Sequence, residues 1–138
     1  MEKTLLKINA QIVANVSEVW EYYTNPSHIT KWNFASDDWH CPSAENNLRV
    51  GGTYRVRMEA KDGSFGFDLE ATYLSIEPGV HMTYVMTDAR EVFISMRDLG
   101  KETLVEIEFE AEQMNALELQ KAGWQAILNN FKKYVEQV

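Results

Sequence analysis

The sequence predicts an α+β fold in which a curved antiparallel sheet grips a long C-terminal helix over an apolar hollow. Residues 48–58 read LRVGGTYRVRM, a double-glycine turn that leads into a strand. Residues 115–135 repeat apolar side chains every 3.6 positions, which indicates a helix with one apolar side. Such a helix, about six turns long, must lie on the apolar face of a sheet.

Composition limits the class of protein. The 138 residues are 45% hydrophobic and 12% aromatic, so we expect one folded domain, residues 1–138, with a buried core. The net charge of −8 and the lack of a basic stripe argue against nucleic acid and anionic membranes as partners. The chain shows no signal segment and no apolar run of membrane-spanning length. A single cysteine, Cys41, fits a reducing compartment, so we expect a small soluble cytoplasmic protein.

The first third of the chain predicts one strand and two short helices. Alternating apolar residues over 3–14 indicate a half-buried strand. Ser17 is the expected N-cap of a helix over 18–24. Asn25-Pro26 ends that helix and begins a second one, because proline is favoured at the first helical position. The polar stretch 33–47 has no clear period and is interpreted as irregular.

From residue 48 onward the pattern predicts an antiparallel meander. Its turn signals are Asp62-Gly63, Pro78-Gly79, the three-residue loop Asp88-Ala89-Arg90, and Gly100-Lys101. The first turn pairs Arg55 with Glu70 and Arg57 with Asp68 on the outer face, so opposite charges meet. All four turns place the apolar side chains on one continuous face of the sheet. A one-residue slip in register would move every side chain of a strand to the opposite face, so the agreement supports the predicted pairing.

The last helix is expected to begin at Asn115, with Glu118 three residues later in a capping-box arrangement. Gly123 lies inside this helix and costs about 1 kcal/mol relative to alanine. Either another backbone approaches closely there, or room is left beside the helix.

The chain resembles a known family over most of its length. The matching residues are Val19-Trp20, Asn25-Pro26, Lys31-Trp32, Trp39, Leu48-Arg49-Val50-Gly51-Gly52, Met58, Asp62-Gly63-Ser64, Gly123-Trp124 and Leu128. It is similar to the bacterial activators of heat-shock-protein-90 ATPase homologues, within the START-like (SRPBCC, birch-pollen-allergen-like) superfamily. The resemblance implies the helix-grip fold, with a seven-stranded sheet wrapped around the C-terminal helix. It also implies a cavity, since some superfamily members bind lipids, sterols or polyketides and a few are cyclases or hydrolases.

The leading hypothesis is a binding protein for a hydrophobic or aromatic small molecule held between sheet and helix. The expected cavity residues are Trp32, Trp39, Tyr54, Met58, Phe67, Tyr84, Met96, Trp124, Ile127, Leu128 and Phe131. Methionine adapts to varied guests, although these residues also suit ordinary core packing. The hydroxyls of Tyr54, Tyr73 and Tyr84 either orient a polar group of a ligand or satisfy one another or a buried water.

Two other hypotheses remain. A cyclase or hydrolase would use the tyrosines with Arg57, Asp68 or Glu70, which requires those charges to face inward. A chaperone-interacting protein would use the outer face of the sheet. We expect no catalytic residues and no cofactor.

Two further features bear on metals and partners. Asp37, Asp38, His40 and Cys41 resemble a metal cluster, but adjacent residues of an extended segment point apart, so no metal site is expected. The 88–90 loop places Val85 opposite Phe93 on the outer face, with Leu74 nearby. This apolar group predicts a homodimer, and a monomer is the alternative.

Overall fold

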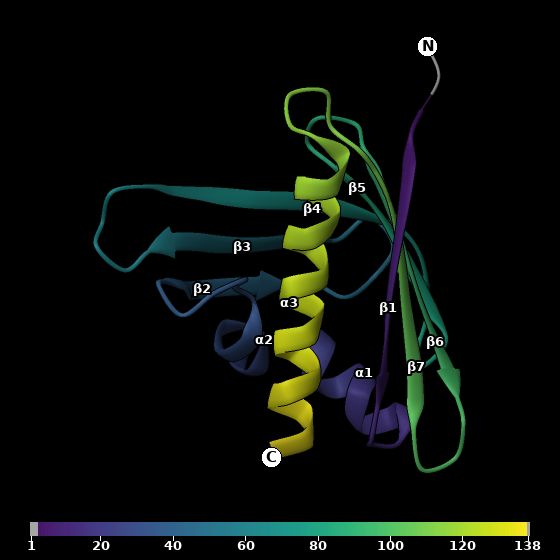
Figure 1. Ribbon diagram of the computed structural model, residues 1–138. Helices are drawn as coiled ribbons and strands as arrows, with labels where there is room; N and C mark the ends of the chain where they lie inside the picture. Colours follow the sequence, from purple (N-terminus) through teal and green to yellow (C-terminus); the bar gives the residue numbers. More distant parts are fainter. Residues whose placement is uncertain (1–2, 138) are drawn as a thin grey trace.

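The computed structural model describes residues 3–137. Seven strands form one antiparallel sheet in the order β1-β7-β6-β5-β4-β3-β2, which confirms the predicted fold class (Figure 1). The elements are β1 (Leu5–Ile12), α1 (Val16–Thr24), α2 (Pro26–Trp32), β2 (Trp39–Asn46), β3 (Thr53–Ala60), β4 (Gly66–Glu77), β5 (His81–Met86), β6 (Glu91–Asp98), β7 (Thr103–Glu110) and α3 (Leu117–Gln137).

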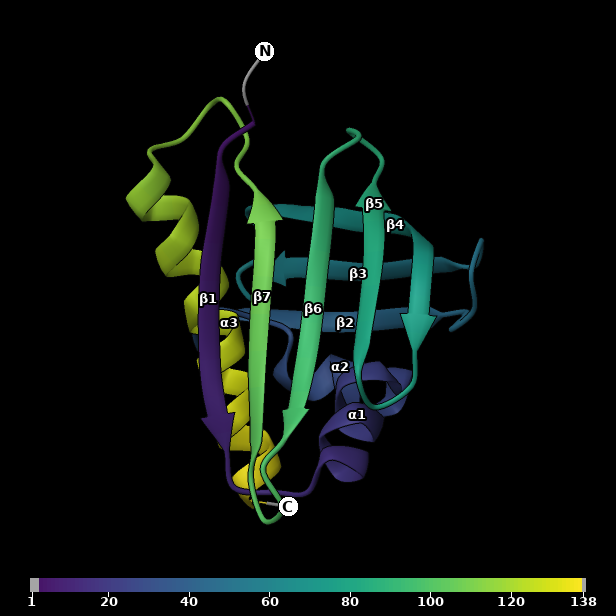
Figure 2. The ribbon, with the colours of Figure 1, turned by 90° about the vertical axis from the view of Figure 1, so that its right-hand side faces the viewer.

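The sheet is strongly bent. In Figure 2, β1, β7, β6 and β5 run upright, whereas β3 and β2 run nearly across them. β4 belongs to both parts, and its pairing with β5 shifts register between Tyr73 and Ser75. Such a bulge bends a strand and increases its twist. The bend makes the inner face concave, and α3 lies in that concavity (Figure 1).

The core lies between the concave face of the sheet and the helices. Phe109 of β7 and Phe131 of α3 are the largest side chains that are fully buried. α3 buries Leu128, Phe131 and Val135, one side of the helix, as its period predicts. Within the described residues, no helix is both long enough and apolar enough to cross a membrane.

Three of the four predicted turns give the predicted pairing. Tyr54 lies opposite Ala71 and Arg57 opposite Asp68, as the Asp62-Gly63 turn requires. The Pro78-Gly79 turn and the Gly100-Lys101 turn likewise give their predicted partners, including Tyr73 opposite Tyr84 and Ile94 opposite Ile107.

The prediction for the β5–β6 turn is wrong. The three-residue loop is 87–89 rather than 88–90, since the Met86 N–H donates to the Arg90 carbonyl over 2.8 Å. Ala89 adopts the positive φ of 74° that such a loop usually assigns to glycine. Val85 therefore lies opposite Glu91, and Phe93 opposite Thr83. The partners shift by two residues, an even number, so the apolar side chains of β5 and β6 still face inward. The predicted Val85–Phe93 pair does not form.

The interpretation of 33–47 as irregular is also wrong, because residues Trp39–Asn46 form β2. β2 is an edge strand that pairs only with β3, and its register shifts between His40 and Ser43. The segment contains Pro42, which is tolerated at sheet edges and bulges but is absent from most central strands. Only Cys41 is fully buried in it, so the segment lacks the alternation that reveals a strand.

The helix starts differ from the predicted ones. Asn15, not Ser17, caps α1, because its side chain accepts a hydrogen bond from the Glu18 N–H. Asn25 caps α2 as predicted, with Pro26 in the first turn. α3 begins at Leu117, and the side chain that bonds Asn115 is that of Glu112 rather than Glu118.

The double-glycine turn before β3 is tied to β4. The Gly51 N–H donates to the Tyr73 carbonyl over 2.9 Å, and the Tyr73 N–H donates to the Gly52 carbonyl over 3.0 Å. A Cβ atom at Gly52 would overlap the carbonyl oxygens of Asn47 and Arg49. The pair thus lets the chain enter β3 in close contact with its own backbone, as a strand-entry turn.

Candidate functional site

A hollow of about 230 Å³ lies between α3, the concave face of the sheet and the ends of α1 and α2. It is somewhat smaller than the roughly 300 Å³ at which ordinary ligand pockets begin. The predicted cavity residues that line it are Trp32, Tyr54, Met58, Phe67, Tyr84, Trp124, Ile127 and Leu128. A Cβ atom at Gly123 would meet nothing within 4 Å, so no other backbone approaches closely there, and Gly123 itself does not line the hollow.

The other predicted cavity residues lie elsewhere. Trp39 lines a neighbouring hollow of about 200 Å³ that shares Met58, Phe67 and Ile127 with the first. Phe131 is fully buried beneath the hollow, with its ring centroid 4.8 Å from that of Trp32. Met96 is buried in the core on β6 and does not line the hollow.

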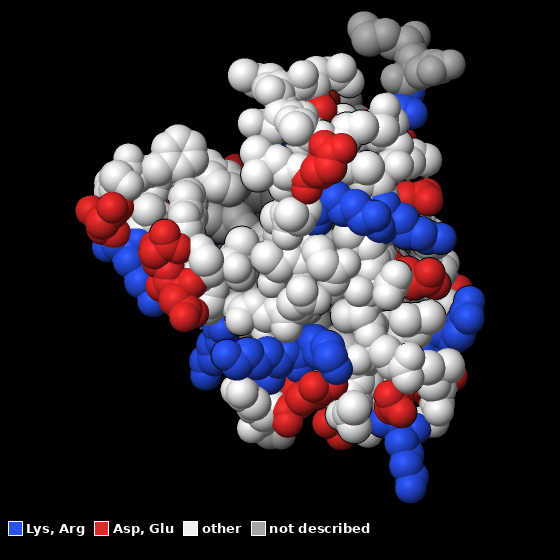
Figure 3. Space-filling model, viewed as in Figure 1, with Lys and Arg blue, Asp and Glu red and all other residues white. Residues whose placement is uncertain are grey.

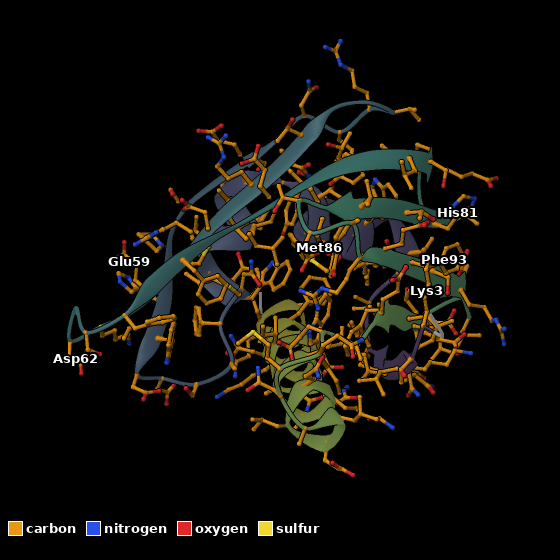
Figure 4. The ribbon with its side chains drawn as sticks, turned by 90° about the horizontal axis from the view of Figure 1, so that it is seen from above. Lys3, Glu59, Asp62, His81, Met86 and Phe93 are labelled. Carbon is orange, nitrogen blue, oxygen red and sulfur yellow. The ribbon has the colours of Figure 1, made fainter. Side chains whose placement is uncertain are left out.

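Sequence reasoning missed several lining residues. They are Tyr23, Asn33, Leu69, Met86, Arg90 and Ile107. Leu69, Met86 and Ile107 lie at strand positions that the predicted turns place on the inner face of the sheet. The predicted pairing could therefore have identified them as lining residues. Figure 4, which looks down on the molecule, places Met86 inside the curve of the sheet, facing α3. Tyr23 and Asn33 come from the α1–α2 region, whose position over the sheet only the tertiary structure reveals.

The floor of the hollow is aromatic and firmly held. The rings of Tyr23 and Trp32 stack with centroids 5.0 Å apart. The Trp32 indole N–H donates to the Tyr22 carbonyl over 2.9 Å. The side chain of Asn130 on α3 donates to the Trp32 carbonyl over 2.8 Å, which fixes α2 against α3. Because both helices are anchored, the lower wall of the hollow is preformed.

Four tyrosine rings gather beside this floor. The Tyr73 hydroxyl donates to Asn46 Oδ1 over 2.7 Å, and Asn46 in turn donates to the Thr24 carbonyl. For the hydroxyls of Tyr23, Tyr54 and Tyr84 we find no hydrogen-bond partner within residues 3–137. Burial raises the pKa of each of these three phenols, and the neighbouring tyrosines raise it further. The phenols are therefore neutral at physiological pH and serve as hydrogen-bonding groups rather than as bases.

Two further polar side chains line the hollow. Asn33 follows α2 and is 5% exposed, and its backbone N–H donates to the Ile29 carbonyl. Its side-chain amide has no hydrogen-bond partner in the described part of the chain. Arg90 comes from the end of the β5–β6 turn, where its Nε lies 2.7 Å from Asp88 Oδ2. Its Nη1 also donates to the Glu110 carbonyl over 3.4 Å.

The charged pairs that the enzyme hypothesis needed lie outside the hollow. Arg55 pairs with Glu70 at 3.3 Å and Arg57 with Asp68 at 3.6 Å, on the partly exposed outer face of β3 and β4. Arg57 also bonds Glu59 at 2.8 Å. Figure 3 shows charged side chains at the tip of the β3–β4 hairpin, whereas the surface between that hairpin and α3 is mostly uncharged. Among residues 3–137, no three His, Cys, Asp or Glu side chains lie close enough to hold a metal ion.

The model of the family described as activator of Hsp90 ATPase homolog 1-like protein matches residues 13–136. The chain belongs to this family. No protein with curated annotation matched it.

Two solved structures of similar sequence share the fold of this chain. The AHSA1-like protein from Aeromonas hydrophila is 40% identical, with a TM-score of 0.91 over 97% of this chain and 93% of its own. Chr148 from Cytophaga hutchinsonii is also 40% identical, with a TM-score of 0.82 over 95% of this chain and 91% of its own. Protein CV1439 from Chromobacterium violaceum, 21% identical with a TM-score of 0.84, shares the fold.

Proposed function

We propose that this protein binds a small hydrophobic, preferably aromatic, molecule in the hollow between α3 and the sheet. The supporting observation is a hollow of about 230 Å³ with walls of aromatic, methionine and aliphatic side chains. Protein interiors are close-packed, and voids larger than a water molecule are few. A mostly apolar hollow with a small number of polar groups is the usual form of a small-molecule site.

The volume limits the size of the guest. The hollow of about 230 Å³ lies below the size of roughly 300 Å³ at which ordinary ligand pockets begin. A molecule of one or two rings fits this space, whereas a sterol or a two-chain lipid needs more. Met58 on β3 and Met86 at the end of β5 both line the hollow, and their side chains are flexible and polarisable. Their flexibility favours a site that adapts to several related guests.

Naphthalene is a suitable probe, because it has two rings and no polar group. We expect calorimetric titration to show one site per chain. Leu69→Trp should abolish binding, since Leu69 lines the hollow and the larger ring would fill it. Leu74→Trp on the outer face of the same strand is the matched control and should bind as the unaltered protein does, because Leu74 is 46% exposed. Failure of naphthalene to bind the unaltered protein would contradict the proposal.

The chaperone hypothesis stays a prediction. Its support is the description of the family, which names an ATPase activator. A pull-down with the heat-shock-protein-90 chaperone tests it, and the outer face of the sheet is the expected contact. We also propose a reducing cytoplasmic location, supported by the single cysteine of the chain.

A further inference from the structure

The polar groups of the hollow differ from the other polar groups buried in the protein. Tyr84 is 6% exposed and Asn33 is 5% exposed, and both line the hollow. Within the described residues, neither the Tyr84 hydroxyl nor the Asn33 side-chain amide has a hydrogen-bond partner. Both side chains are thus more than nine-tenths buried, and their polar atoms have only the hollow left to bond into.

Comparable groups nearby are satisfied. The Tyr73 hydroxyl donates to Asn46, the Trp32 indole N–H to the Tyr22 carbonyl, and the Thr103 hydroxyl to the Ala14 carbonyl. Most buried polar atoms in proteins have such a partner, and an exception needs an explanation. Within residues 3–137, the one fully enclosed side-chain polar atom without a partner is Nδ1 of His81, which lies with Phe93 at the outer face of the sheet, far from Met86 in Figure 4. The Tyr84 hydroxyl and the Asn33 amide differ from it, because their residues line the hollow. The unpartnered hydroxyl and amide are therefore a local property of the hollow.

We propose that the ligand is a small aromatic molecule with one hydroxyl or carbonyl group, oriented with that group against Tyr84 and Asn33. This inference rests on the proposed function. A phenol hydroxyl both donates and accepts, and an asparagine amide does the same with separate atoms. Together they can bond a hydroxyl or a carbonyl oxygen. The rings of Tyr54 and Tyr84 lie beside each other with centroids 5.6 Å apart, so two hydroxyl-bearing rings form one corner of the lining.

The polar group of the ligand is neutral. Burial disfavours charge in this corner, as the raised pKa values of Tyr54 and Tyr84 show. The one cationic side chain that lines the hollow within residues 3–137 is Arg90, and Asp88 already pairs with it at 2.7 Å. A carboxylate ligand would thus lose its hydration without gaining a free cation.

Naphthalene and 2-naphthol test the inference, because they differ only by a hydroxyl group. The measured quantity is the ratio of the two dissociation constants, naphthalene to 2-naphthol, for each variant. The hydration of the free ligands is the same in every case, so it does not affect a comparison of these ratios between variants. Tyr84→Phe and Asn33→Leu should each lower the preference for 2-naphthol over naphthalene by about 2- to 10-fold, the value of an ordinary hydrogen bond. Tyr134→Phe is the control, because its hydroxyl bonds His28 outside the hollow, and it should keep the preference.

A measurement on the unaltered protein covers the case in which a variant does not fold. In NMR titrations, 2-naphthol should shift the side-chain amide resonances of Asn33 further downfield than naphthalene does. Equal ratios in all variants, or equal Asn33 shifts with both probes, would overturn the inference and leave the proposed function standing. Absence of naphthalene binding would instead contradict the proposed function itself.

Discussion

The indole ring of Trp124 on α3 lies flat on the ring of Phe109 on β7, with centroids 4.2 Å apart and planes inclined by 11°. This stack joins the helix to the sheet at the wall of the hollow. Trp124→Ala should destabilise the fold by about 2–4 kcal/mol, because it removes buried area and the stacked ring. Urea unfolding measures this change. Trp124→Phe keeps a ring there and should cost clearly less; equal losses for both variants would show that the stack contributes little.

Phe67 lines both neighbouring hollows, as Met58 and Ile127 do, and it is the most exposed of the three at 41%. Phe67→Ala should join them into one longer site with little loss of stability. We therefore expect 4-phenylphenol to gain affinity in this variant relative to 2-naphthol. Phe65→Ala, on the same hairpin but lining neither hollow, should leave that ratio unchanged. Calorimetry measures both, and an unchanged ratio in Phe67→Ala would show that the two hollows act separately.

Cys41 should react slowly with thiol reagents in the folded protein. Its side chain is buried, and burial raises the pKa of the thiol to about 11, from an ordinary value of 9.0. Because the thiolate is the reactive form, two pKa units mean about 100-fold less thiolate at pH 8. Ellman's reagent measures the rate, and the denatured protein is the control. A folded rate close to the denatured one would mean that the edge strand β2, which contains Cys41, opens readily.

Replacing Arg57 with alanine should leave folding and naphthalene binding nearly unchanged. Its pairs with Asp68 and Glu59 lie on the outer face, where solvent weakens them. The unfolding midpoint and the dissociation constant are the measurements. If binding falls while the midpoint stays constant, the guanidinium acts in the site and the enzyme hypothesis regains support.

The dimer stays a prediction. The apolar group on the outer face of the sheet, which supports it, is smaller than the sequence suggested. Leu74 and Phe93 are 46% and 43% exposed on the outer face, but Val85 lies opposite Glu91 rather than Phe93. His81 also stacks on Phe93, with ring centroids 5.8 Å apart. Light scattering over a range of concentrations decides between a dimer and a constant mass near 15.9 kDa. If a dimer forms, Phe93→Glu should dissociate it without unfolding the chain.

Local signals explain which parts of the fold were predictable. Asp62-Gly63 and Pro78-Gly79 set their hairpins through the backbone preferences of their own residues, so the pairing on both sides followed. Ala89 has no such signal, because its positive φ is imposed by the hairpin rather than favoured by alanine. Because the predicted loop was displaced by one residue, every predicted pair between β5 and β6 differs from the observed pair by two residues.

The site was less predictable than the fold. Parity shows which face of a strand is inward, and this was sufficient for Tyr54 and Tyr84. It does not show where the sheet bends, so Met96, inward on β6, lies in the packed core rather than at the hollow. The bulge beside Tyr73 decides that bend, and Asn33 reaches the hollow only through the docking of α2. Neither relationship is a property of neighbouring residues in the sequence.

An open sheet has two free edges, and a free edge can recruit a strand from another molecule. In this protein both edges are obstructed. Along β1, the side chains of Gln125 and Lys132 on α3 donate to the outward carbonyls of Asn9 and Gln11. Along β2, the register shift after His40 and the missing N–H of Pro42 interrupt the regular row of donors. The helix and the irregular edge strand therefore protect the protein against edge-to-edge aggregation.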